Sequence, residues 1–235
     1  MTTSGTQSFN LDLSNLIEEA FERCGSELRT GYDMRTARRS LNLLTIEWAN
    51  RGINLWTIEQ GQIAMTTGTI VYNLPVDTVD LIEQVIRTQT GIPQTDINIT
   101  RISVDTYATI PNKNAQGRPI QVWINRQSGV LTPTGIAYPT INVWPAPDQD
   151  NFYTFVYWRL RRMQDAGSGS NVQDIPFRLI NCLVSGLAYY LSMKSPEAAQ
   201  RMPQLKQMYD EQLMLALDED REKAPLRIAP RQLFY

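Results

Sequence analysis

The side chains best suited to bind a ligand are arginines, which fall in two clusters. The clusters are Arg35, Arg38 and Arg39, and Arg159, Arg161 and Arg162. Guanidinium groups gathered in this way can bind the phosphates of passing DNA. They can also form a solvated face, or ion pairs with carboxylates of a neighbouring subunit. We favour the solvated or ion-paired interpretation because the formal net charge of the chain is −2.

The sequence offers little that could support catalysis. It contains no histidine, which excludes Ser-His-Asp and Cys-His nucleophiles and histidine-based metal sites. No GxSxG, Walker or HExxH motif occurs, and Cys24 and Cys182 are far apart, inside apolar helical patterns. Carboxylate pairs such as Glu18 and Glu22 fit a solvated helix face better than a glycosidase site. We therefore predict a protein that is not an enzyme and binds no cofactor or metal.

The segment from residue 224 to 235 gives the strongest indication of a partner. Pro225 and Pro230 exclude a continuous helix, and large apolar side chains are unusual in a disordered tail. We predict an extended arm that becomes ordered when it binds another protein. The side chains expected to make that contact are Pro225, Arg227, Ile228, Arg231, Leu233, Phe234 and Tyr235.

Two helices are predicted in the first part of the chain. Residues 12–24 repeat apolar side chains at helical spacing, with Asp12 as the N-cap and Gly25 as the C-terminal stop. Residues 34–50 show the same helical spacing of apolar side chains, and Asp33 can cap this second helix. The first arginine cluster lies on the opposite face of the second helix.

From about residue 55 to residue 160 the chain is rich in Thr, Val, Ile, Tyr and Trp, which is typical of strands. Gln62–Thr66 and Thr69–Leu74 are predicted to form a hairpin around Thr67 and Gly68. Further predicted elements are strands at Leu81–Thr88, Ile120–Asn125, Thr140–Trp144 and Phe152–Leu160, and a short helical turn at Ser103–Ile110. The aromatic residues assigned to packing are Trp123, Trp144, Tyr153 and Trp158.

Helices are predicted again near the end of the chain. Residues 165–171, DAGSGSN, have the composition of a flexible linker. Asp174 is expected to cap the next helix, and Ser195 and Pro196 to begin a further one that Pro203 kinks or breaks. The apolar positions are Phe177, Ile180, Val184, Leu187 and Leu191 in the first helix, and Leu205, Met208, Tyr209, Leu213, Ala216 and Leu217 in the second.

Together these elements predict an α+β fold: an antiparallel bundle of about four helices, an inserted and protruding β-rich domain, and an extended C-terminal arm. The expected boundaries are 1–54 and 165–223 for the helices of the bundle, 55–164 for the β-rich domain and 224–235 for the arm.

Composition narrows the class of protein. Hydrophobic residues make up 42% and charged residues 20% of the chain, as in ordered globular proteins. The 24 acidic residues outnumber the 22 basic ones, which argues against a general nucleic-acid coat. No apolar run approaches a membrane span, and residues 1–9 lack the features of a signal peptide. We therefore expect a protein that is made and kept in a cytoplasm.

Seven stretches of the chain carry a resemblance to a known family. They are RRSLNLLTIEWANRGINLWTIEQGQ (38–62), YNLPVDTVDLIEQVIR (72–87), RIS (101–103), IPNKNAQGRP (110–119), YWRLRRMQDAG (157–167), IPFRLINCLVSGLAYYLSMKSPE (175–197) and DEDREKAP (218–225). In this order they resemble the head-to-tail adaptors of tailed bacteriophages, namely the gatekeeper or tail tubular protein A class of T7-like podoviruses and the adaptor of P22-like phages. The similarity covers nearly the whole chain beyond the first ten residues.

The resemblance implies a structural virion protein at the head-tail junction, assembled in the host cytoplasm. It implies a ring, usually of twelve copies, beneath a dodecameric portal. The partners would be the portal, a tail nozzle or other tail proteins, and further copies of the chain, while packaged DNA passes through the lumen without sequence-specific binding. The C-terminal segment of such adaptors commonly reaches the portal, so residues 224–235 become the expected portal contact. The larger β region leaves open whether that domain contacts a nozzle, fibres or a neighbouring subunit.

Three alternatives remain at this point. The first is another tail-completion or fibre-adaptor component with the same fold but without the portal contact. The second is a DNA-binding protein that uses Arg35, Arg38 and Arg39, and the third is a carboxylate-based hydrolase acting on cell wall.

Overall fold

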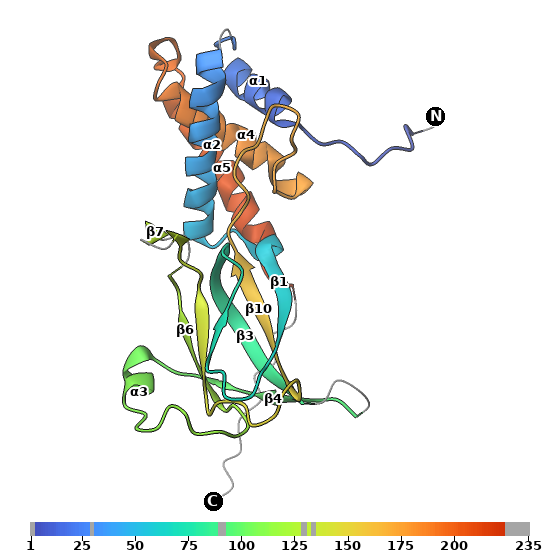
Figure 1. Cartoon of the computed structure of the whole chain (residues 1–235). Coiled ribbons are helices and arrows are strands. Elements are labelled where there is room, and N and C mark those ends of the chain that lie inside the picture. The colour runs from blue at the N-terminus through green and yellow to red at the C-terminus, as the bar shows by residue number, and fades with distance from the viewer. Residues whose placement is uncertain (1–2, 29–30, 89–92, 128–130, 133–134, 224–235) are drawn as a thin grey trace, which may run out of the picture. The chain divides into compact units, whose positions relative to one another are not determined.

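A computed structural model shows a chain made of two compact units (Figure 1). One unit combines the residues up to Trp56 with those from Met163 onward, and the other is Thr57–Arg162. The first holds the long helices and the second holds the sheets, which confirms the predicted α+β class. The structure describes residues 3–28, 31–88, 93–127, 131–132 and 135–223.

Four helices form the first unit: α1 (Leu13–Cys24), α2 (Gly31–Arg51), α4 (Ile180–Ser192) and α5 (Met202–Glu219). The capping residues of α1 are the predicted ones. The Asp12 carboxylate accepts a hydrogen bond from the Asn15 amide at 2.8 Å, and Gly25 ends the helix with φ 78°, a left-handed conformation that suits glycine. Three short 3-10 helices, η1 (Leu55–Thr57), η2 (Phe177–Leu179) and η3 (Pro196–Ala198), border the connections.

The helix α4 is the centre of this unit, since it packs against α1, α2 and α5. Its close approach to two neighbours depends on Gly186, where a Cβ atom would lie 2.8 Å from both Leu44 Cδ2 and Tyr209 Cε2. The indole Nε1 of Trp48 donates a hydrogen bond to the Tyr209 hydroxyl at 3.2 Å across the same core. The tight packing of α2, α4 and α5 therefore requires a residue without a side chain at position 186.

Several predictions for the later helices need correction. Phe177 is 75% exposed, since it lies in η2 before α4 begins, while Ile180, Val184, Leu187 and Leu191 are buried as predicted. Asp174 was predicted to cap this helix, but the N-cap position of η2 is Pro176. The Asp174 carboxylate instead accepts a hydrogen bond from the Gln164 amide. The helix expected from residue 196 is interrupted, as predicted for Pro203, because α5 begins only at Met202 with this proline in its first turn.

The predicted linker 165–171 is hydrogen-bonded to the first turn of α1. The carbonyl oxygens of Asn171 and Gly169 accept hydrogen bonds from the amides of Leu13 and Ser14, at 2.9 and 3.0 Å. The Asn171 side chain also accepts from the Ser168 amide at 2.7 Å. These bonds satisfy amides that a helix N-terminus leaves without partners, so the segment has a defined structural role that its composition did not indicate.

The second unit contains two four-stranded sheets and a small two-stranded one. The strand orders are β1-β10-β3-β4 and β2-β9-β6-β5, and β7 pairs with β8. Buried side chains of the two larger sheets, such as Phe155 and Val143, belong to one apolar core. The strands are β1 (Ile58–Ala64), β2 (Val71–Asn73), β3 (Thr78–Thr88), β4 (Thr95–Asn98), β5 (Thr100–Arg101), β6 (Gln121–Asn125), β7 (Leu131–Thr132), β8 (Gly135–Ile136), β9 (Thr140–Trp144) and β10 (Tyr153–Arg161). The short helix α3 (Val104–Ala108) is capped by Ser103.

The predicted hairpin of residues 62–74 is wrong. The turn at Gly68 exists, with φ 71°, but the strands on either side of it enter different sheets. β1 pairs with β10 along its whole length, and β2 pairs with β9. The chain crosses between the sheets at this turn, and Met65, just after β1, is fully buried in the core that the two sheets share.

Candidate assembly surface

The exposed side of α2 carries one continuous row of side chains, which we call the α2 stripe. Its members recur at intervals of three or four residues, so they lie on one face of the helix. The stripe consists of Tyr32, Arg35, Arg39, Leu43 and Ile46, all of them exposed. The opposite face buries Ala37, Leu41, Leu44 and Trp48 in the core. The stripe is therefore on the solvent-exposed side of α2.

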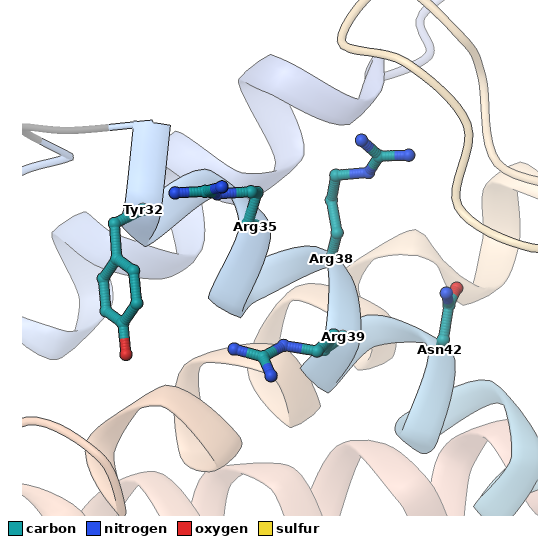
Figure 2. Close-up of a pocket in the computed structure, with 5 residues that line it drawn as sticks. All are labelled: Tyr32, Arg35, Arg38, Arg39 and Asn42. Carbon is teal, nitrogen blue, oxygen red and sulfur yellow. The ribbon is translucent and has the colours of Figure 1, made fainter.

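The structure separates the three arginines of the first cluster. Arg38 is half-buried, and its Nη2 donates a hydrogen bond to the Ala166 carbonyl at 3.2 Å. Figure 2 shows Arg35 and Arg39 projecting toward the side of Tyr32, whereas Arg38 extends the other way. Among the described residues, neither Arg35 nor Arg39 forms an ion pair with a carboxylate. These two guanidinium groups remain available to an external anion, in a hollow of about 540 Å³ that Asn42 completes.

A second hollow of about 840 Å³ borders the same stripe. The lining from α2 includes Tyr32, Asp33, Arg39 and Leu43. Leu191 lines it from α4, and Lys194 and Glu197 line it from the segment that follows α4. The Lys194 ammonium donates a hydrogen bond to Ser40 Oγ at 2.6 Å. Partial burial, and then the nearby charge of Arg39, lower the pKa of Lys194. The hollow combines apolar side chains with two cations, Arg39 and Lys194, and two carboxylates, Asp33 and Glu197.

The second arginine cluster has a different role from those considered in the sequence. Arg159 contacts Asp77 at 2.6 Å and Glu59 at 2.8 Å, with only 12% of its side chain exposed, and Arg161 contacts Glu59 at 2.7 Å. The hydrogen bond from Arg159 lowers the pKa of Asp77. Arg159 and Arg161 thus pair with carboxylates of their own chain.

The helix α5 presents a surface of opposite character. Its sequence contains one lysine against four carboxylates. Leu205, Tyr209, Leu213 and Ala216 bury one side, and Asp210, Glu211, Met214 and Asp218 lie on the other, where all four are exposed. Met214 is 68% exposed, and the adjoining Leu215 is 63% exposed. We call Asp210, Glu211, Met214, Leu215 and Asp218 the α5 face.

A family model described as SU10 adaptor protein matches residues 11–229 of this chain. The chain belongs to the SU10 adaptor protein family. This places it among phage head-to-tail adaptors, whose role is structural and not enzymatic, and both predictions are thereby confirmed at that level. A comparison with curated proteins gives no match.

Other residues of the adaptor have structural roles or lie outside the described region. Trp123 stacks on Tyr107 with ring centroids 5.4 Å apart, and Trp144 Nε1 donates to the Asn112 carbonyl at 2.9 Å. The described residues include no helix that is long and apolar enough to cross a membrane, and no cluster suited to a metal ion. The expected portal contacts, Pro225, Arg227, Ile228, Arg231, Leu233, Phe234 and Tyr235, lie outside the described residues.

The two cysteines are buried, and their thiols are difficult to ionise. Burial raises the pKa of Cys24 to about 11 and that of Cys182 to about 12. The sulfur atom of Cys24 donates a hydrogen bond to the Ala188 carbonyl at 3.0 Å. Both residues therefore act as small packing groups, as their apolar surroundings in the sequence indicated.

The α5 face is an exposed surface, with apolar and acidic side chains, that the sequence analysis missed. The predicted apolar stripe of this helix included Met208, which is 39% exposed, and omitted Met214 and Leu215. The available signal was the position of Met214 and Leu215 beside the buried row, flanked by carboxylates. Apolar side chains in an acidic helix face are typical of a surface that another protein covers.

Proposed function

We propose that this adaptor assembles into a ring of twelve copies beneath a portal ring, where it extends the DNA channel and docks the tail. The observation that carries the proposal is the exposure of apolar side chains on two different helices, Leu43 and Ile46 on α2 and Met214 and Leu215 on α5. A protomer with two dissimilar adhesive faces assembles head to tail, and such contacts produce a ring when the rotation closes. Membership in the adaptor family supports the same arrangement.

The proposal extends to the partners and the place of assembly. Residues 224–235, which combine two arginines with Leu233, Phe234 and Tyr235, would bind the portal as in the T7-like and P22-like adaptors that the chain resembles. Such a segment adds affinity because a second contact made by an already bound protein is effectively intramolecular. The adaptor would join the virion at the head-tail junction after synthesis in the host cytoplasm, and DNA would pass through its lumen without base recognition.

The first test is electron microscopy of the purified adaptor mixed with the portal ring encoded in the same genome. We expect a second ring stacked on the portal, with the same rotational symmetry. A variant that ends at Lys223 should leave the portal bare while keeping the melting temperature of the full chain. Bare portals with the full-length, folded adaptor would contradict the proposal and favour another tail component.

A further inference from the structure

The α2 stripe and the α5 face have complementary charge and similar apolar content. The stripe contains Arg35 and Arg39 beside Leu43 and Ile46, and Lys194 lies next to Arg39. The α5 face contains carboxylates on both sides of Met214 and Leu215. On each helix a charged position is followed, one helical turn away, by an exposed apolar side chain. This spacing allows ion pairs and apolar contacts to form together when the two surfaces meet.

We infer that the α5 face of one copy docks on the α2 stripe of the next copy, and that this contact is the repeating interface of the ring. Met214 and Leu215 would enter the hollow of about 840 Å³ beside Leu43 and Leu191. The carboxylates of Glu211 and Asp218 would face the guanidinium groups of Arg35 and Arg39. The inference rests on the proposed ring and adds to it the surfaces through which successive copies bind.

The charges of the two surfaces favour contact between an α2 stripe and an α5 face over contact between two identical surfaces. Two α2 stripes face to face would bring arginines against arginines, and two α5 faces would bring carboxylates against carboxylates. Both two-fold arrangements are therefore repulsive, whereas the mixed pairing is attractive. A surface that rejects itself and accepts the other favours rings over symmetric dimers.

Burial in the interface also explains the unpaired arginines. Arg23, Arg51, Arg87 and Arg101 each have a carboxylate of their own chain within 2.9 Å. Arg35 and Arg39 have none among the described residues, although Asp33 is two residues from Arg35 in sequence. The partners of Arg35 and Arg39 are then expected in another molecule. An acidic helix with an apolar centre would offer carboxylates to these two guanidinium groups and apolar side chains to Leu43 and Leu191 in the hollow beside them.

The inference can be tested by reversing charge on each surface separately. Arg35→Glu with Arg39→Glu makes both surfaces acidic, and Glu211→Lys with Asp218→Lys makes both basic. We expect either double variant alone to form no ring on the portal in electron micrographs. An equimolar mixture of the two should form rings again, because each acidic stripe or face then meets a basic one. The copies must alternate in such rings, and twelve is an even number.

Native mass spectrometry measures how many copies of each double variant the mixed rings contain. We expect equal numbers of the two double variants in each ring, and a chain with all four reversals should form rings by itself. Glu83→Lys, an exposed charge reversal on β3 of the other unit, is the matched control and should assemble like wild type. Melting temperatures of the separate variants, which change only exposed positions, should remain close to that of wild type.

The outcomes separate this inference from the proposed ring. Wild-type adaptor that forms no ring on the portal would contradict both. Rings that form equally well with either double variant alone would overturn the interface and leave the ring intact. If such rings then bound DNA more weakly only with Arg35→Glu and Arg39→Glu, the stripe would be assigned to DNA phosphates instead.

A cross-link gives independent evidence for the same contact. Leu43→Cys and Met214→Cys in one chain place two thiols on the two surfaces. Oxidation should join neighbouring copies into a ladder of multimers on non-reducing gels, and each single variant should remain monomeric. Cys24 and Cys182 do not compete because both are buried. Absence of the ladder in assembled wild-type-like rings would contradict the docking.

Discussion

Gly186 is the position where the helical unit can be perturbed most sharply. It lies in the middle of α4, and alanine there would place a Cβ atom 2.8 Å from Leu44 and 2.8 Å from Tyr209. Ordinary contacts between carbon atoms have separations of about 3.5–4.0 Å. Leu44 is fully buried, and Tyr209 is held by the hydrogen bond from Trp48. Neither side chain can move aside without disturbing the core.

Two effects of Gly186→Ala oppose each other. In a solvent-exposed helix the change would stabilise by about 1 kcal/mol, because glycine has the poorer helix propensity of the two. Overpacking of a filled core costs about 1–3 kcal/mol. With two contacts this short, we expect the cost to exceed the gain and to leave a net loss of about 1–2 kcal/mol. For a chain of this size that corresponds to a fall in melting temperature of about 2–8 °C.

Hydrogen exchange followed by mass spectrometry can localise the effect. Amides of α4 and α5 should exchange faster in Gly186→Ala, while those of β10, in the other unit, should keep the wild-type rate. Thermal unfolding by circular dichroism provides the change in melting temperature.

A double-mutant cycle with Leu44→Ala tests the cause. Removal of the Leu44 side chain eliminates one of the two short contacts, so Gly186→Ala should cost less in that background than in wild type. Additive losses, or a wild-type background in which alanine at position 186 stabilises the chain, would refute the reasoning from close packing.

Three further predictions concern buried or paired groups. Asp220 accepts hydrogen bonds from the amides of Asn54 and Leu55 at 2.7 and 3.2 Å, so Asp220→Ala should cost about 2–4 kcal/mol in denaturant unfolding, whereas the exposed Asp218→Ala should cost nothing measurable. Arg159 lowers the pKa of Asp77 in the folded chain. The ion pair therefore stabilises the fold at pH values above about 4, the pKa of Asp77 in the unfolded chain, and this stabilisation is lost as pH falls through the lower pKa of the folded chain. The difference in melting temperature between wild type and Asp77→Asn should therefore shrink on acidification from pH 5 to about pH 2, and a constant difference would contradict this. Finally, the thiols of Cys24 and Cys182, with pKa values raised to about 11 and about 12, should not react with a thiol reagent at pH 8 unless the chain is unfolded; rapid reaction of the native protein would show that the helical core opens.

Local patterns in the sequence were sufficient for most individual elements. The helix α1 follows the predicted residues 12–24 with its predicted caps, and β9 has the predicted bounds Thr140–Trp144. Helical spacing also located the arginines of the α2 stripe. These features depend on residues that are neighbours along the chain, so their signals are contained in a short window.

Features that depend on distant residues were not predictable in this way. The partner of β1 is β10, far along the chain, and a turn signal at Gly68 carries no information about it. The segment at 165–171 looked flexible because its composition cannot show that Gly169 and Asn171 bond to the start of α1. The hollow beside the α2 stripe likewise needs Leu191 from α4 and Lys194 from the segment that follows α4.

The pairing of Ile58 with Leu160 brings the two ends of the β unit side by side. Once its strands have paired, the β unit therefore connects the helices before and after it as a short loop would. The entropy lost on closing a chain segment grows with segment length, so early folding of the β unit would ease the later association of α2 with α4. During translation the β unit leaves the ribosome before α4 does, which permits this order of folding.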